Sequence, residues 1–164
     1  MKTLILGIGN DILTDDGIGP RIVRDLETDC RRKDVVLNQH TLGGLEALEA
    51  MKDFDRIIFI DAIKTTGGIP GEIYRFTADS FRETLHLSNL HDVNFLTAME
   101  LGKRLGYRTP EEIHIFAVEI AEDRVFSSSF SAELEPLYPA ILDEIRLAVV
   151  SILEEAVVQS AERS

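Results

Sequence analysis

Three side chains that lie far apart in the sequence, Asp16, Asp61 and His91, could together bind a divalent metal ion. They would supply two carboxylate oxygens and one imidazole nitrogen. Such a mixed donor set suits a borderline metal such as nickel or zinc, and it leaves coordination positions open for water or a substrate. Spacing alone does not show that the three residues converge, so the elements that carry them decide whether they can meet.

Asp16 belongs to the most unusual segment of the chain, GIGNDILTDDGIG over residues 7–19. Two glycines at its start permit a tight turn after an apolar strand, as in a dinucleotide-binding fingerprint. The third glycine of that fingerprint is replaced by Ile12, and Asp15 and Asp16 would put negative charge where a pyrophosphate should lie. Nucleotide binding is therefore disfavoured. One of the two acids can satisfy free N–H groups at the start of the next helix, which leaves the other available for a cation.

Asp61 closes the apolar run RIIFID, and in an open α/β sheet ligands bind outside the carboxyl ends of the strands. The alternative is that Asp61 only caps the next turn. His91 falls in the first turn of a predicted helix, where the helix dipole disfavours the imidazolium and leaves a neutral ring able to coordinate metal. The alternative here is an incidental surface histidine. The remaining histidines are interpreted as structural or surface residues: His40, His86 and His114.

Apolar runs that alternate with amphipathic ones predict an α/β fold. Strands are expected over 3–8, 34–39, 56–61, 72–77 and 112–118, and helices over about 20–31, 44–52, 90–105 and 132–157. The strand 56–61 is apolar throughout and is expected at the centre of the sheet. Pro136 and Pro139 kink the last helix or delay its start. Together, these elements predict a three-layer α/β/α sandwich in a single domain over residues 1–164, with 158–164 as a frayed tail.

Composition excludes several classes of function. The chain has 29 acidic against 17 basic side chains, a net charge of −12, which repels nucleic acids and anionic membranes. A basic or neutral polypeptide would be attracted, although an acidic surface can also serve solubility alone.

Cys30 is the only cysteine, so neither an internal disulfide nor a multi-cysteine metal site can form, and its thiol is interpreted as structural. No signal peptide or membrane span is recognisable, and a cytoplasmic location is expected.

The segment GIGNDILTDDGIG, the strand-end Asp61 and the helix-opening His91 resemble the nickel–iron hydrogenase maturation endopeptidases, from Met1 to about Leu153. The resemblance implies a phosphorylase/hydrolase-like fold with a mixed five-stranded sheet. One strand of that sheet is antiparallel, and residues 72–77 are the candidate for it.

The resemblance also implies that Asp16, Asp61 and His91 are the metal-binding and catalytic residues of the cleft. Asp16 stands where some relatives have Glu, which shortens the reach by one methylene. Relatives tend to carry an acid in the loop that matches Gln39–Gly44, and this chain has none there. A substrate role for that loop position is therefore not expected in this protein.

The implied reaction is hydrolysis of one peptide bond near the C-terminus of a hydrogenase large-subunit precursor, after nickel has been inserted. A divalent metal in the cleft could activate water, or the three residues could recognise nickel already held by the precursor, with a carboxylate as general base. The second is favoured, because three protein ligands, two of them carboxylates, would hold nickel weakly. The partner is then the precursor, and the protease is expected to be a monomer.

Two alternatives to the maturation protease stay open from the sequence. One is a nickel- or precursor-binding maturation factor that cuts no bond. The other is a different hydrolase on the same fold, related to spore germination proteases or purine phosphorylases. The acids at the predicted anion site, Asp15 and Asp16, count against a phosphorylase.

Overall fold

The computed structural model describes residues 1–40, 44–77, 80 and 99–162. Its centre is a five-stranded sheet in the order β2-β1-β3-β5-β4. The strands are β1 (Thr3–Ile8), β2 (Val35–His40), β3 (Arg56–Ile63), β4 (Ile73–Thr77) and β5 (Glu112–Glu119). Every strand pair is parallel except β4 with β5, which is antiparallel at the edge. The mixed sheet, the central place of β3 and the antiparallel β4 confirm the sequence predictions.

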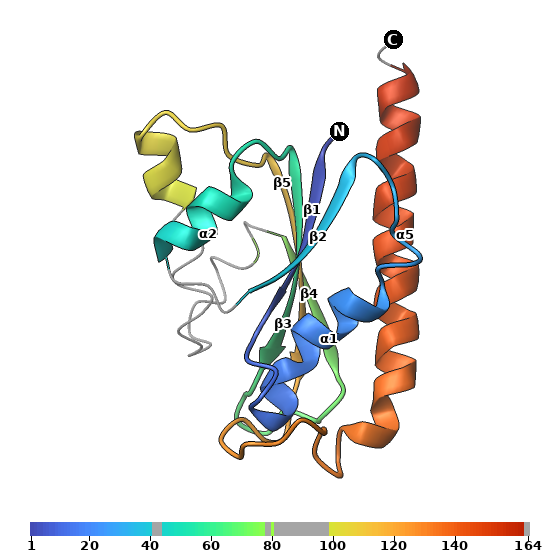
Figure 1. The fold of residues 1–164 in the computed structure, drawn as a ribbon. Coiled ribbons are helices and arrows are strands. Elements are labelled where there is room, and N and C mark those ends of the chain that lie inside the picture. The colour runs from blue at the N-terminus through green and yellow to red at the C-terminus, as the bar shows by residue number, and fades with distance from the viewer. Residues whose placement is uncertain (41–43, 78–79, 81–98, 163–164) are drawn as a thin grey trace.

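Helices cover both faces of this sheet (Figure 1). On one face lie α1 (Ile18–Asp25) and the long α5 (Tyr138–Glu162), and on the other lie α2 (Gly44–Met51) and a helical segment over residues 99–104. Short 3-10 turns, η1 (Thr14–Gly17) and η2 (Glu135–Leu137), precede α1 and α5. The described part of the chain therefore has the three layers expected of an α/β/α sandwich.

Each face of the sheet carries its own apolar core, because successive strand residues point to opposite faces. On one face, Ile58 of β3 belongs to the same buried cluster as Ile145 of α5. On the other face, Phe59 of β3 belongs to a cluster with Leu48 of α2 and Met99. The fully buried β3 thus contributes side chains to both cores.

The structure corrects several predicted boundaries. The helix α1 ends at Asp25, not near residue 31, and a turn follows it. Strand β3 continues to Ile63, because β5 pairs with it through that residue. The last helix begins only at Tyr138 and runs to Glu162, so residues 158–162 of the expected frayed tail are helical.

The helix predicted over 90–105 can be compared only in part. Residues 99–104 are helical, and the expected stop at Gly106 is confirmed by a φ of 76° there. Residues 90–98 lie outside the described part of the chain. None of the helices that are described is long and apolar enough to span a membrane.

Candidate active site

Asp16 is held at the carboxyl end of β1 by its own loop. The backbone N–H of Asn10 donates a hydrogen bond of 2.7 Å to its Oδ2, and the side-chain oxygen of Asn10 accepts the N–H of Ile12 at 3.2 Å. The carboxylate is half-buried, so one partner orients it while a ligand can still approach it. Asn10 is a positioning residue that the sequence reasoning missed, although it stands in the Gly-Ile-Gly-Asn part of the unusual segment.

Asp15, the neighbouring acid, is fully buried and has a different role. Its carboxylate accepts the backbone N–H groups of Ala121 (3.2 Å), Glu122 (2.9 Å) and Ser131 (2.7 Å), and the Ser131 hydroxyl at 2.7 Å. The expectation that an acid here caps the next helix is wrong, because the N-cap of α1 is Gly17 and no side chain caps it. Asp15 instead fastens the loop after β5 to the loop after β1, which leaves Asp16 as the available acid.

Two close backbone approaches bring the Asp16 segment against the central strands. A Cβ on Gly9, whose φ is 137°, would lie 2.0 Å from the carbonyl oxygen of Asp16. A Cβ on Gly19 would lie 2.4 Å from the carbonyl oxygens of both Ile8 and Ile60. Only glycine allows these contacts. The start of α1 therefore lies directly against the last residue of β1 and against Ile60 of β3, the residue before Asp61.

Asp61 lies in β3 opposite Ala117 of β5, two residues before the strand ends rather than at its last position. It is 5% exposed, and its Oδ1 accepts the N–H of Ala62 at 2.8 Å. Strand alternation places it on the same face of the sheet as Phe59, the face that α2 covers. Asp61 is thus a buried acid near the carboxyl end of β3, one residue after the carbonyl that Gly19 approaches.

His91, the third predicted site residue, lies outside the described residues. Among the described residues, no three His, Cys, Asp or Glu side chains gather closely enough to hold a metal ion. The structure places Asp16 in the turn after β1 and Asp61 near the carboxyl end of β3, and the three-residue metal set stays a prediction.

A further acid, Glu119, holds the loop after β3 at the carboxyl end of the parallel strands. It is buried at the end of β5, where its carboxylate accepts the N–H of Thr65 at 2.7 Å and the Thr65 hydroxyl at 2.9 Å. A Cβ on Gly68 would lie 2.1 Å from the Glu119 Cδ, so the loop crosses directly over the carboxylate. The sequence reasoning missed this residue, although an acid that ends the apolar run EIHIFAVE was the available signal.

Cys30 is excluded as a nucleophile by its surroundings. It is completely buried in the core between α1 and α5, and burial raises the pKa of its thiol to about 11. The thiolate that would attack a substrate is therefore scarce at neutral pH. The structural interpretation of this cysteine is confirmed.

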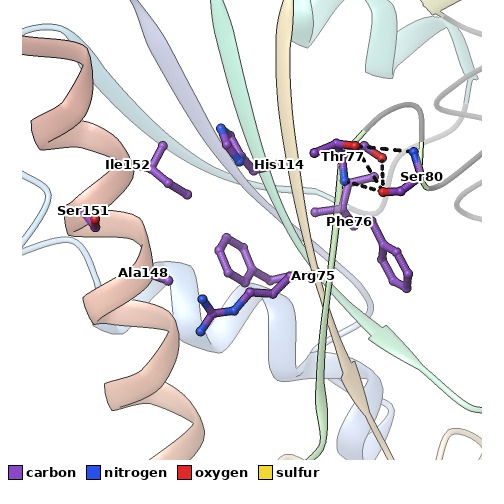
Figure 2. A pocket seen from close by; sticks show the side chains of 10 residues that line it. Arg75, Phe76, Thr77, Ser80, His114, Ala148, Ser151 and Ile152 are labelled. Atoms are coloured by element: carbon purple, nitrogen blue, oxygen red, sulfur yellow. Dashed lines mark hydrogen bonds between the residues drawn. The ribbon is translucent and has the colours of Figure 1, made fainter. Parts of the chain in front are cut away.

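Away from the carboxyl ends of the parallel strands, a cavity of about 330 Å³ opens between α5 and strands β4 and β5 (Figure 2). Most of its polar lining is already paired. Thr77 and Ser80 hydrogen-bond to each other, and Arg75 pairs with Glu144 at 2.9 Å. His114 on its wall lies near the start of β5, at the opposite end of that strand from Glu119. This cavity is separate from the site of Asp16 and Asp61.

Two known proteins match the chain, one over less than half of its length and one over nearly all of it. It is 40% identical over 72 residues to the hydrogenase 2 maturation protease of Escherichia coli K12, a stretch that covers 43% of this chain and 44% of the relative. It is 27% identical over 158 residues to the hydrogenase expression/formation protein HupD of Rhodobacter capsulatus, covering 94% and 70% of the two chains.

Solved structures agree with these sequence matches. The hydrogenase maturating endopeptidase HybD from E. coli superposes with a TM-score of 0.76 at 25% identity, over 95% of this chain and 94% of the other. The [NiFe] hydrogenase maturation protease HybD from Thermococcus kodakarensis shares the fold, with a TM-score of 0.67 at 24% identity and coverages of 90% and 99%. The predicted fold class is confirmed.

A family model described as hydrogenase maturation protease (HycI) matches residues 20–157. The matched range includes Asp61 and His91 and begins just after Asp16. Together with the full-length likeness to a maturating endopeptidase, the match confirms the family and the protease activity that the sequence predicted. This chain belongs to the hydrogenase maturation protease family.

Proposed function

We propose that this protease removes the C-terminal extension of a nickel-containing hydrogenase large-subunit precursor after nickel insertion. Asp16, Asp61 and His91 recognise the nickel ion, which is part of the substrate and arrives with the precursor. The observation that carries the proposal is the contact of Gly19 with the carbonyls of Ile8 and Ile60. This contact brings the segment that carries Asp16 against the strand that carries Asp61. It lies towards the carboxyl ends of the strands, where open α/β sheets bind ligands.

The two acids differ in surroundings, and this difference suggests different roles. Asp16 is half-buried with one N–H donor on its carboxylate, so water and substrate can reach it. Besides its part in recognising nickel, we assign it as the general base that takes a proton from the attacking water, whose oxygen forms the new bond to the scissile carbonyl carbon. The C–N bond then breaks, and the leaving nitrogen takes up the proton that Asp16 removed from the water. The buried Asp61 contacts the nickel ion, and His91 supplies a nitrogen ligand.

The decisive experiment is trimming of a nickel-loaded precursor, followed by mass spectrometry. Asp16→Asn, Asp61→Asn and His91→Ala should each lower the trimming rate by at least about 100-fold, as expected for loss of a general base or a metal contact. Asp143→Asn is the matched control, because it makes the same replacement at an exposed acid of α5 that pairs with Arg146. This control should trim at the rate of the wild type.

The same assay separates the alternatives. Normal trimming by all three variants contradicts the assigned residues. A wild-type protein that binds the precursor without shortening it is the non-proteolytic maturation factor. Treating only the protease with a chelator, and then removing the chelator, distinguishes the two mechanisms. Lasting loss of activity means a resident metal, whereas retained activity supports recognition of nickel in the precursor.

The proposal also covers assembly and location. The protease acts as a monomer in the cytoplasm, on a precursor whose charge is less acidic than its own net −12. Sedimentation of the free protein and cell fractionation are the corresponding measurements. A stable dimer would contradict the monomeric state, and a membrane-associated pool would contradict the location. Neither result would bear on the assigned catalytic residues.

A further inference from the structure

Three large apolar side chains are exposed on two loops beside Asp16. Ile12 is 55% exposed, Val125 55% and Phe126 75%. Ile12 lies in the loop after β1, and Val125 and Phe126 lie in the loop after β5. In Figure 1 both loops lie at the same end of the molecule, next to the start of α1. We call these three residues the apolar patch.

Backbone hydrogen bonds hold the two loops side by side. Leu13 and Ser127 form a parallel bridge, with the Ser127 N–H on the Ile12 carbonyl at 3.1 Å and the Thr14 N–H on the Ser127 carbonyl at 3.1 Å. Ile12 and Phe126 each precede a residue of this bridge, so they lie opposite each other across the pairing. Ile12 and Phe126 are thus neighbours across the bridge, and Val125 is next to Phe126 in the chain.

The patch is held rigidly. Thr14 is a β-branched residue at φ 41°, a conformation that costs free energy and persists only where the surroundings enforce it. Its hydroxyl donates to the Val125 carbonyl, and the buried Asp15 anchors the same loop at Ala121, Glu122 and Ser131. The backbone that carries these side chains is therefore held in place, and exposed large apolar side chains gathered at one place are typical of an interaction surface.

Charge and position indicate the occupant. The acids around the patch are largely balanced, because Asp11 pairs with Arg24 at 3.6 Å and Asp123 with Lys64 at 2.9 Å, and Arg124 follows Glu122. The whole chain, however, carries a net charge of −12, which favours a partner segment of neutral or basic charge. The patch lies beside the candidate site, because Leu13, the residue after Ile12, accepts the Asp16 N–H on its carbonyl at 2.9 Å.

We infer that the apolar patch docks a segment of the large-subunit precursor that carries apolar side chains and no net negative charge, and so guides the scissile bond to Asp16. This inference rests on the proposed function. It adds that Ile12, Val125 and Phe126 determine how tightly the precursor binds, whereas Asp16 determines how fast the bound precursor is cut.

The test compares Phe126→Ser with Leu147→Ser, a control that removes an equally exposed apolar side chain, 73%, from α5. Both replacements leave the core untouched, and equal thermal midpoints verify this. Phe126→Ser should raise KM for trimming about tenfold, the usual effect of losing one buried aromatic contact, and leave kcat unchanged. Leu147→Ser should leave both constants unchanged. Asp16→Asn should lower kcat instead.

Binding is measured separately, so that the inference and the proposed function fail in different ways. Precursor binding to Asp16→Asn should weaken about tenfold when Phe126→Ser is added, whether or not the wild type cuts the precursor. Unchanged binding and unchanged KM overturn the inference while trimming stands. Concentration-dependent self-association that Phe126→Ser abolishes, with precursor binding intact, also overturns it, because the patch then joins two copies of this chain.

Discussion

Two adjacent residues of the same type show how strongly position decides the role of a side chain. Asp15 and Asp16 are chemically identical, yet Asp15 is fully buried with four hydrogen-bond donors on its carboxylate, while Asp16 is half-buried and accepts the Asn10 N–H. Bonds between a charged acceptor and backbone N–H groups are among the stronger ones in proteins. The first acid therefore stabilises the loops, and the second is free for chemistry.

Replacing the buried acid should unfold the protein more easily. Asp15→Ala leaves the N–H groups of Ala121, Glu122 and Ser131 without their acceptor, and we expect the free energy of unfolding to fall by about 3 kcal/mol. Asp16→Ala, which removes the same group from a half-exposed position, should cost less than about 1 kcal/mol. Urea denaturation measures both. Equal losses for the two variants would show that Asp15 is not the structural acid.

At the scale of elements, one buried cation ties two strands to the last helix. The Arg56 side chain, 2% exposed at the start of β3, donates to Glu112 of β5 at 2.7 Å and to the Ile152 carbonyl of α5 at 2.7 Å. The His114 ring nitrogen Nε2 lies 2.7 Å from the other Glu112 oxygen. Burial alone would raise the pKa of Glu112, but hydrogen bonds and charge from Arg56 and His114 outweigh it and hold the pKa below its usual 4.5.

This direction predicts a pH dependence of stability. A carboxyl whose pKa is lowered by folding contributes stability that is complete above about 4.5 and is lost as the pH falls through the lower folded value. Glu112→Gln should lower the free energy of unfolding by about 2 kcal/mol at pH 7, because Arg56 then lacks its counter-charge. The gap to the wild type should shrink towards pH 3. Glu111→Gln, at the exposed neighbour, should show neither effect.

For the whole molecule, the important feature is that both apolar cores rest on the same strands. Ile145 of α5 and Leu48 of α2 lie on opposite sides of the sheet, in separate buried clusters. The strands β1, β3 and β5 contribute side chains to both clusters. Unfolding of the helices on either face would therefore destabilise the strands on which the other cluster packs. The described residues should therefore unfold as one cooperative unit.

Truncation on either side of the sheet tests this expectation. Ile145→Ala and Leu48→Ala should each lower the free energy of unfolding by about 3 kcal/mol through loss of buried volume. Each should shift a single transition seen alike by circular dichroism and by tyrosine fluorescence. Leu147→Ala, on the exposed side of α5, should change stability by less than about 0.5 kcal/mol. Two separated transitions in either core variant would contradict a single folding unit.

Much of the fold could be read from the sequence, because hydrophobic periodicity is a local property. The runs TLILGI and RIIFID are largely apolar, which predicted buried strands and a central place for the second of them. The alternation of polar and apolar residues over 72–77 predicted a strand there, which the structure shows as β4. Asp16 and Asp61 were recognised from their places after or near the ends of such runs.

Only the tertiary structure decided which contacts join those elements. The partners of Asp15 are at least 106 positions away in the chain, and the pairing of Leu13 with Ser127 spans a similar separation. Nothing in the sequence marks Ser131 as a partner or Ile12 as the neighbour of Phe126. Local pattern determines which segments become strands and helices. Long-range hydrogen bonds and close glycine contacts, which form only once the chain has folded, determine which acid is structural and which is exposed for chemistry.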